Sequence, residues 1–210
     1  IMSEYNKKSY LVLGYILAVT GILFSIYSVI PSITSYPFPI EWSEGGRIFA
    51  AYQVYAPIIS GKYLSLPWLD PGRSILDGIA FLIPNLPIWA YRFWVRILFL
   101  IFNCLTAIFA IRRTFMYSQM TGNRNIALRV LLTLLGMLFL LQGPVNYHVL
   151  AGILPILWLY DENRPIRNLI IIIVCSVWEG LCRVNWFMMP AVIAILMQVL
   201  RTPFPRNKFL

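Results

Sequence analysis

The stretch YLVLGYILAVTGILFSIYSVI, residues 10–30, is 21 residues long and carries no charged side chain. Lys7 and Lys8 precede it. About 20 apolar residues in an α-helix cross the hydrocarbon core of a bilayer. We therefore expect a first membrane-spanning helix here, retained because no small-residue cleavage site of a signal peptide follows. Gly14, Ala18 and Gly21 would share one helical face and let another helix approach closely.

The composition of the whole chain agrees with a membrane protein. Of its 210 residues, 60% are hydrophobic and 12% are charged, whereas a soluble domain carries about 25% charged residues. This excludes a soluble globular protein. The length allows at most about six spans and one sizeable loop. We therefore expect an all-α, polytopic transmembrane helical bundle, with residues 1–210 forming a single integral membrane domain.

Residues 31–91 differ from the rest of the chain. Eight prolines interrupt them, and four acidic residues lie among them: Glu41, Glu44, Asp70 and Asp77. Their apolar runs, residues 48–59 and 75–83, are too short to cross a bilayer, and runs of this length often lie in the interface. We expect a structured external loop whose two helices lie on the outer membrane surface.

The remaining sequence predicts five more spans. Residues 94–111 form the second and end at Arg112 and Arg113. Residues 126–141 and 145–160 predict one helical hairpin, and residues 169–178 and 184–200 predict another, divided at residues 179–183. A basic tail, residues 201–208, follows. Arg92 and Arg96 are four residues apart and share a face at the entry to the second span.

The charge distribution predicts the orientation, because basic residues concentrate at cytoplasmic ends of spans. With both termini inside, the external set has six basic residues: Arg47, Lys62, Arg73, Arg92, Arg96 and Arg183. The cytoplasmic set has eleven: Lys7, Lys8, Arg112, Arg113, Arg124, Arg129, Arg164, Arg167, Arg201, Arg206 and Lys208. We expect an integral protein of a plasma or inner membrane. The net charge of +9 then reflects membrane orientation, and nucleic acid is not expected as a partner.

Polar residues from three separate parts of the sequence fall on the external side of this topology. They are Glu41, Glu44, Arg47, Gln142, Asn146, His148, Glu179, Arg183 and Asn185. Ionisable groups at membrane depth cost about 2.5–3.5 kcal/mol on insertion scales, so they are usually paired or functional. We expect one outward-facing site to collect them. Glu41 and Glu44 could serve as catalytic acids or hold a divalent metal, or they could simply cap a helix in a solvated loop.

The basic candidates also have two interpretations. Glu179 and Arg183 are spaced i, i+4, so they could neutralise each other on one helix, or Arg183 could bind an anionic phosphate. His148, the only histidine, could contact a phosphate or carry a proton, or it could be a hydrogen-bonded structural residue. Together with the scattered residues Cys104, Cys175 and Cys182 it predicts no zinc or haem site.

This layout resembles the membrane-embedded GT-C glycosyltransferases. The resemblance lies in one N-terminal helix, a long external loop with early acids in Glu41-Trp-Ser-Glu44-Gly-Gly, and an Arg-flanked second span with short later helices. Residues 178–186, WEGLCRVNW, are similar to a polar turn of that family. The family uses a polyprenyl-phosphate sugar. The resemblance implies that Glu41 or Glu44 takes the place of the family's first-loop acid, which acts as a base or a metal ligand. It also implies that Arg183 binds the phosphate of the carrier.

Two functions follow as expectations. The first is transfer of a sugar from a lipid-phosphate carrier to an acceptor on the outer face, with Arg47 and His148 assisting Arg183 at the phosphate. The second is a non-catalytic multi-pass accessory subunit, packed against protein partners in a larger membrane complex. Both imply contact with membrane lipids. No cofactor is expected with certainty, and a divalent metal is left open. The family usually has more helices, so this chain resembles a short or truncated form.

Overall fold

The computed structural model describes residues 4–67, 69–117, 123–143 and 147–201. Within these ranges the chain is entirely helical, with eight α-helices and three 3₁₀ turns and no strand, which confirms the all-α class. The elements are α1 (Glu4–Val29), η1 (Ile30–Ser32), α2 (Glu44–Ser60), α3 (Pro71–Gly78), η2 (Ile79–Leu82), α4 (Ile88–Tyr117), α5 (Asn123–Leu141), α6 (Tyr147–Leu159), α7 (Pro165–Cys182), η3 (Val184–Trp186) and α8 (Met189–Arg201).

Among the described residues, three helices are long and apolar enough to cross a membrane. They cover Ser9–Ser32, Ile88–Met116 and Pro165–Cys182. α5, α6 and α8 are apolar but shorter, so the map of about six spans stays a prediction. Most apolar side chains of α1 are exposed, and lipid would cover them.

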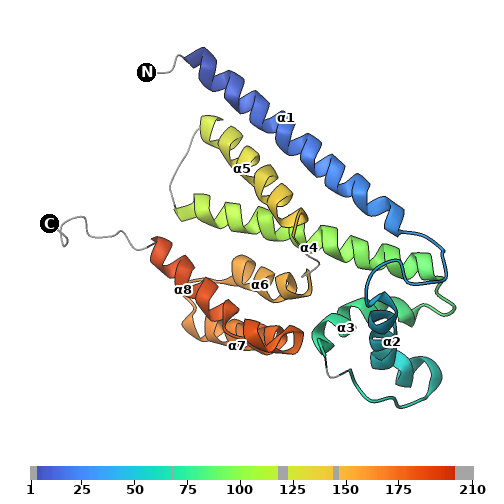
Figure 1. The fold of residues 1–210 in the computed structure, drawn as a ribbon. Helices are drawn as coiled ribbons and strands as arrows, with labels where there is room; N and C mark the ends of the chain where they lie inside the picture. The colour runs from blue at the N-terminus through green and yellow to red at the C-terminus, as the bar shows by residue number, and fades with distance from the viewer. Residues whose placement is uncertain (1–3, 68, 118–122, 144–146, 202–210) are drawn as a thin grey trace.

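Different helices meet at the two ends of the bundle (Figure 1). Successive helices from α4 to α8 run in alternating directions. α2 and α3 lie together with the end of α1, the start of α4 and the end of α7, and we call this the loop end. The start of α1, the end of α4 and the end of α8 lie at the opposite end, called the terminal end. Residues 31–91, which we call the loop segment, are therefore separated from the terminal end by the length of the bundle.

α1 packs against α5 through the small-residue face predicted from the sequence. Ala18 is fully buried. A Cβ atom on Gly14 would lie 3.3 Å from Leu131, and one on Gly21 would lie 2.8 Å from Leu138. These glycines let the two backbones approach closely, which confirms the prediction.

The loop segment folds into two packed helices. The helices predicted at residues 48–59 and 75–83 correspond to α2, which begins earlier at Glu44, and to α3 with η2. α3 packs tightly on α2, because a Cβ atom on Gly78 would lie only 2.5 Å from the carbonyl oxygen of Ala51. The Tyr55 hydroxyl also donates to the carbonyl of Ile75 at 3.0 Å. α3 is thereby fixed between α2 and the end of α7.

The predicted break at residues 179–183 is wrong in position. α7 continues through Glu179 to Cys182, and the chain leaves the helix at Arg183, whose backbone is extended at φ −159°. The Arg183 N–H still donates to the Glu179 carbonyl at 2.7 Å and closes the last turn. Of the other predicted features, Asn146 and the tail after Arg201 lie outside the described residues.

Candidate functional site

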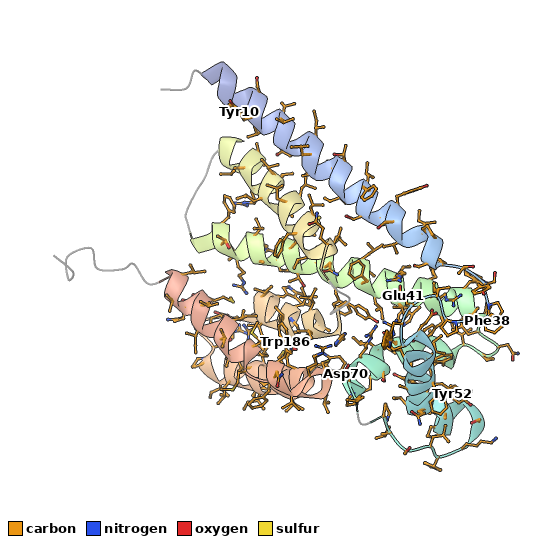
Figure 2. All side chains as sticks on the ribbon, viewed as in Figure 1. Tyr10, Phe38, Glu41, Tyr52, Asp70 and Trp186 are labelled. Atoms are coloured by element: carbon orange, nitrogen blue, oxygen red, sulfur yellow. The ribbon has the colours of Figure 1, made fainter. Side chains whose placement is uncertain are left out.

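A narrow cavity at the loop end brings together charged residues from the loop segment and α4. Figure 2 shows Glu41 at this end of the bundle. The space open to the centre of a water-sized sphere is about 30 Å³, enough for about two water molecules. The lining consists of Ser32, Ile40, Glu41, Glu44, Arg47, Arg73, Asp77, Tyr91, Arg92, Val95 and Arg96. Four arginines and three acids meet here.

Glu44 forms a buried ion pair with Arg92. The Arg92 Nε donates to Glu44 Oε1 at 2.8 Å and its Nη2 donates to Oε2 at 3.1 Å. The side chains are 10% and 3% exposed. The backbone N–H of Ile40 adds a bond of 2.7 Å to Glu44 Oε2. Both carboxylate oxygens are therefore occupied, and Glu44 begins α2 in a fixed position.

Arg92 also holds the chain that follows α1. Its Nη1 donates to the carbonyls of Thr34 and Tyr36 at 2.6 and 2.8 Å, and its Nη2 donates to the carbonyl of Phe38 at 3.0 Å. With the two bonds to Glu44, all five N–H groups of the guanidinium are used. Arg92 and Glu44 therefore form part of the cavity wall. Arg92 has no N–H left to donate to a ligand.

Glu41 lies between two other arginines. Its Oε2 accepts from Arg47 Nη2 at 3.0 Å and its Oε1 accepts from Arg96 Nη2. Arg96 Nε also donates to the Ser32 hydroxyl at 2.8 Å. The Glu41 side chain is 38% exposed. In contrast to Glu44, Glu41 is an accessible carboxylate whose partners come from two elements.

Both carboxyl groups are ionised at neutral pH. Partial burial alone would raise the pKa of Glu41, but Arg96 and Arg47 outweigh it and lower that pKa below its usual value. Burial acts in the same way on Glu44, where Arg92 and the Ile40 N–H lower the pKa. A carboxylate held by two guanidinium groups is a weak base. Glu41 would accept a proton more readily after losing at least one arginine partner.

The lining of the cavity also contains Asp77 and Arg73 of α3. Asp77 Oδ2 lies 3.4 Å from Arg73 Nε, and Asp77 Oδ1 accepts from the Tyr147 hydroxyl of α6. The Arg73 guanidinium lies 5.9 Å from the centre of the Tyr147 ring. Burial raises the pKa of Asp77, although Arg73 and Tyr147 oppose this shift. This cluster ties α3 to α6.

The structure does not bring every candidate residue into this cavity. Glu41, Glu44 and Arg47 line it, whereas His148 and Arg183 do not. His148 is almost fully buried in α6, and within the described residues both ring nitrogens lack a hydrogen-bond partner. Arg183 is exposed where α7 ends.

The i, i+4 pair of Glu179 and Arg183 is not formed. Arg183 leaves the helix in an extended conformation, so its side chain no longer follows the helical face of Glu179. Glu179 is fully buried, and neither of its carboxylate oxygens has a partner among the described residues. It lies against Gly152, where a side chain would leave it no room.

The residues of the cavity do not fit a divalent metal. Among the described residues, no group of three or more His, Cys, Asp or Glu side chains is placed to hold one. Mg²⁺ and Ca²⁺ need several oxygen ligands, but the oxygens of Glu41 and Glu44 already accept from arginines. The surrounding guanidinium groups would also repel a cation.

The terminal end holds a second and wider cavity, of about 680 Å³ by the same measure. Arg113 lines it and donates to the carbonyls of Leu157, Trp158 and Tyr160 at 2.6–2.9 Å. This arginine satisfies carbonyls that the end of α6 leaves open. Glu41 and Glu44 are far from it in the sequence and absent from its lining.

Sequence reasoning did not identify Arg73, Arg92, Arg96 and Asp77 as parts of the site. The i, i+4 spacing of Arg92 and Arg96 was a usable signal, because two cations on one face at a membrane boundary need anionic partners. Nothing in the sequence pairs them with Glu44 and Glu41, which lie 48 and 55 residues away. Comparison with protein-family models, curated proteins and solved structures finds no significant match.

Proposed function

We propose that this protein is a GT-C-like glycosyltransferase that moves a sugar from a lipid-phosphate carrier to a hydroxyl acceptor, with Glu41 as the catalytic base. The observation that carries the proposal is the accessible carboxylate of Glu41 beside Arg47 and Arg96 in one cavity at the loop end. An acid and phosphate-binding groups in one place are what this transfer requires.

The proposed reaction is a substitution at the anomeric carbon of the sugar. The acceptor oxygen forms a bond to this carbon, and the bond from the carbon to the phosphate oxygen breaks. The leaving lipid phosphate keeps the electron pair, and its charge is stabilised by arginine N–H groups. Glu41 accepts the proton of the acceptor hydroxyl. No oxidant, reductant or metal is needed for this balance.

Glu41 is a better candidate than Glu44 for two reasons. It is more exposed, at 38% against 10% of the side chain. Glu41 also accepts only one hydrogen bond at each oxygen among the described residues, whereas Glu44 is enclosed by Arg92 and the Ile40 N–H. In this proposal Glu44 is a positioning residue that holds the start of α2.

The phosphate-binding role is assigned first to Arg47 and Arg96. Arg73 lines the same cavity and is a third candidate. Arg183 and His148 lie outside the lining. Arg183 is exposed where α7 ends and is kept as a secondary candidate for parts of the carrier beyond the cavity, whereas His148 is buried and would need a rearrangement to take part. The proposal includes the six-span topology, with both termini in the cytoplasm and the loop end outside.

A non-catalytic accessory subunit is the second candidate. The observation that favours it is the small open space of about 30 Å³, which admits water but not a sugar without rearrangement. In this alternative the charged cluster fixes the loop segment, and protein partners cover the exposed apolar helices.

The deciding experiment measures transfer by the purified protein in lipid nanodiscs. A panel of polyprenyl-phosphate sugars and hydroxyl acceptors is supplied, and released polyprenyl phosphate is quantified. We expect Glu41→Gln to lower turnover by about 10²–10⁴-fold, the usual contribution of a positioned base, without lowering the unfolding temperature.

Asp70→Asn is the matched control, because it also removes one carboxylate charge from the external segment but lies outside the cavity. It should retain wild-type turnover. Full activity of Glu41→Gln would remove Glu41 from the mechanism. A folded wild-type protein that releases no polyprenyl phosphate from any donor would contradict the transferase and favour the accessory subunit.

A further inference from the structure

Glu41 occupies one donor on each of the two arginines that an anionic ligand would bind. Its two oxygens take one N–H each from Arg47 and Arg96. Within the described residues, Arg47 Nε and Nη1 and Arg96 Nη1 make no hydrogen bond, since the remaining bonds of these two arginines go to Trp42 and Ser32. Two guanidinium groups with free donors suit a tetrahedral oxyanion, which accepts through several oxygens.

The small volume of the cavity indicates that a ligand can enter only if a side chain moves out. The open volume of about 30 Å³ holds about two water molecules, and a phosphate group needs more. Glu44, Arg92 and Asp77 cannot give way cheaply, because each is buried and hydrogen-bonded or paired to another element. Glu41 is the exposed acid of the lining, so its movement is the least costly way to make room.

We propose that the Arg47–Arg96 pair is a phosphate-binding site that the Glu41 carboxylate fills in the absence of ligand, and that a phosphate ester, either the diester of the sugar donor or the monoester product, displaces this carboxylate when it binds. The inference rests on the proposed function, because the ligand is the phosphate of its carrier. It adds that Glu41 and phosphate exclude each other at these donors. The displaced carboxylate loses the arginines that lower its pKa and becomes a free base only when donor is bound.

Two ligand sources share this chemistry, and separate probes distinguish them. Inorganic phosphate tests a site for the free anion, and farnesyl phosphate tests a site for a lipid-linked monoester. Binding is measured by calorimetry on the full chain in nanodiscs at fixed ionic strength, for the wild type, Glu41→Gln and Asp70→Asn. Preference for farnesyl phosphate supports a lipid carrier, whereas equal affinity supports a free phosphate ligand at the same site.

If Glu41 and phosphate compete for the arginines, removing the Glu41 charge should tighten phosphate binding. If Glu41 instead contacted the phosphate, removing it would weaken binding. Glu41→Gln should tighten phosphate binding by at least about tenfold. In the wild type, phosphate must break charge-assisted hydrogen bonds between Glu41 and the arginines, and one such bond is worth about a factor of ten in affinity. Asp70→Asn should change the affinity less than about twofold, because it removes the same charge at a position outside the lining of the cavity. Arg96→Gln should weaken binding in the wild type and in the Glu41→Gln background.

A measurement on the wild-type protein covers the case in which Glu41→Gln does not fold. Infrared difference spectra on adding phosphate should contain a shifted carboxylate stretch, because Glu41 loses two arginine partners. Wild-type binding with no such shift, or with Glu41→Gln binding equally or more weakly, overturns the exchange and leaves the transferase proposal intact. No binding of either probe by any folded variant overturns both.

Discussion

At the scale of single residues, Glu44 and Glu41 differ in how their arginines hold them. Glu44 is enclosed with Arg92, whose five donors are all used within the protein. Removing one partner of a buried pair leaves the other charge without compensation. The two acids are three residues apart in the sequence but should therefore respond differently to the same substitution.

We expect Glu44→Gln to lower the free energy of unfolding by about 3–5 kcal/mol at pH 7, the usual cost of breaking a buried pair. The pKa of Glu44 is lowered in the folded protein, so its ionised form stabilises the fold above the unfolded pKa of 4.5. This contribution is lost as the pH falls through the lower folded pKa. The difference between wild type and variant should therefore shrink below about pH 4.5.

Denaturant unfolding in detergent micelles at pH 7 and at pH 3.5 measures this difference. Asp70→Asn serves again as the control, because Asp70 makes no capping hydrogen bond and asparagine tolerates its positive φ of 48°. A stability difference for Glu44→Gln that is absent at pH 7, or equal at both pH values, would contradict the pairing of Glu44 with Arg92.

The residue scale also limits what the sequence could predict of the site. Glu41, Glu44 and Arg47 lie within seven residues, so their proximity followed from the sequence. The partners on α4 did not, because helical spacing gives the face of Arg92 and Arg96 but not the loop that folds onto it. The pairing of Glu179 with Arg183 was wrong because i, i+4 spacing assumes a continuous helix, and Arg183 lies outside it.

At the scale of helices, packing in the loop segment depends on one close approach. Gly78 of α3 lies where a Cβ atom would be 2.5 Å from the Ala51 carbonyl of α2. A backbone atom cannot rotate away as a side chain can. The position of α3, and with it Arg73 and Asp77 in the cavity, therefore depends on the absence of a side chain here.

Gly78→Ala should cost about 1–3 kcal/mol of stability, as overpacking usually does, because α3 must move away from α2. Gly46→Ala is the matched control, since Gly46 lies in α2 with no neighbour within 4 Å of a Cβ atom. Alanine is a better helix former than glycine by about 1 kcal/mol, so this control should be neutral or stabilising. Equal unfolding midpoints for the two variants would contradict the tight contact between α2 and α3.

The helices themselves were largely predictable from apolar runs. The uncharged stretch at residues 10–30 and the stretch before Arg112 gave α1 and α4, although α4 extends beyond residues 94–111 at both ends. The added residues include Arg92, Arg112 and Arg113, which a search for uncharged runs excludes. Helix ends were less predictable because tertiary pairing, and not composition, decides how charged residues continue a helix.

At the scale of the whole molecule, the two ends have different chemistry. The loop end gathers acids and arginines into a narrow paired cavity. The terminal end carries Arg112, Arg113 and Arg167 beside the wider cavity. Basic residues mark the cytoplasmic side of membrane proteins, but both ends carry arginines, so the orientation proposed from charge counts stays a prediction.

This orientation predicts that the two ends face opposite sides of the membrane. Ser65 is exposed in the segment between α2 and α3, and Asn163 is exposed in the turn between α6 and α7. Ser65→Cys should react with a membrane-impermeant maleimide in intact cells, whereas Asn163→Cys should react only after permeabilisation. The wild type controls for Cys104, Cys175 and Cys182, of which the last two are buried. Labelling of both positions from the same side would refute the six-span topology, because an odd number of crossings must separate the two segments.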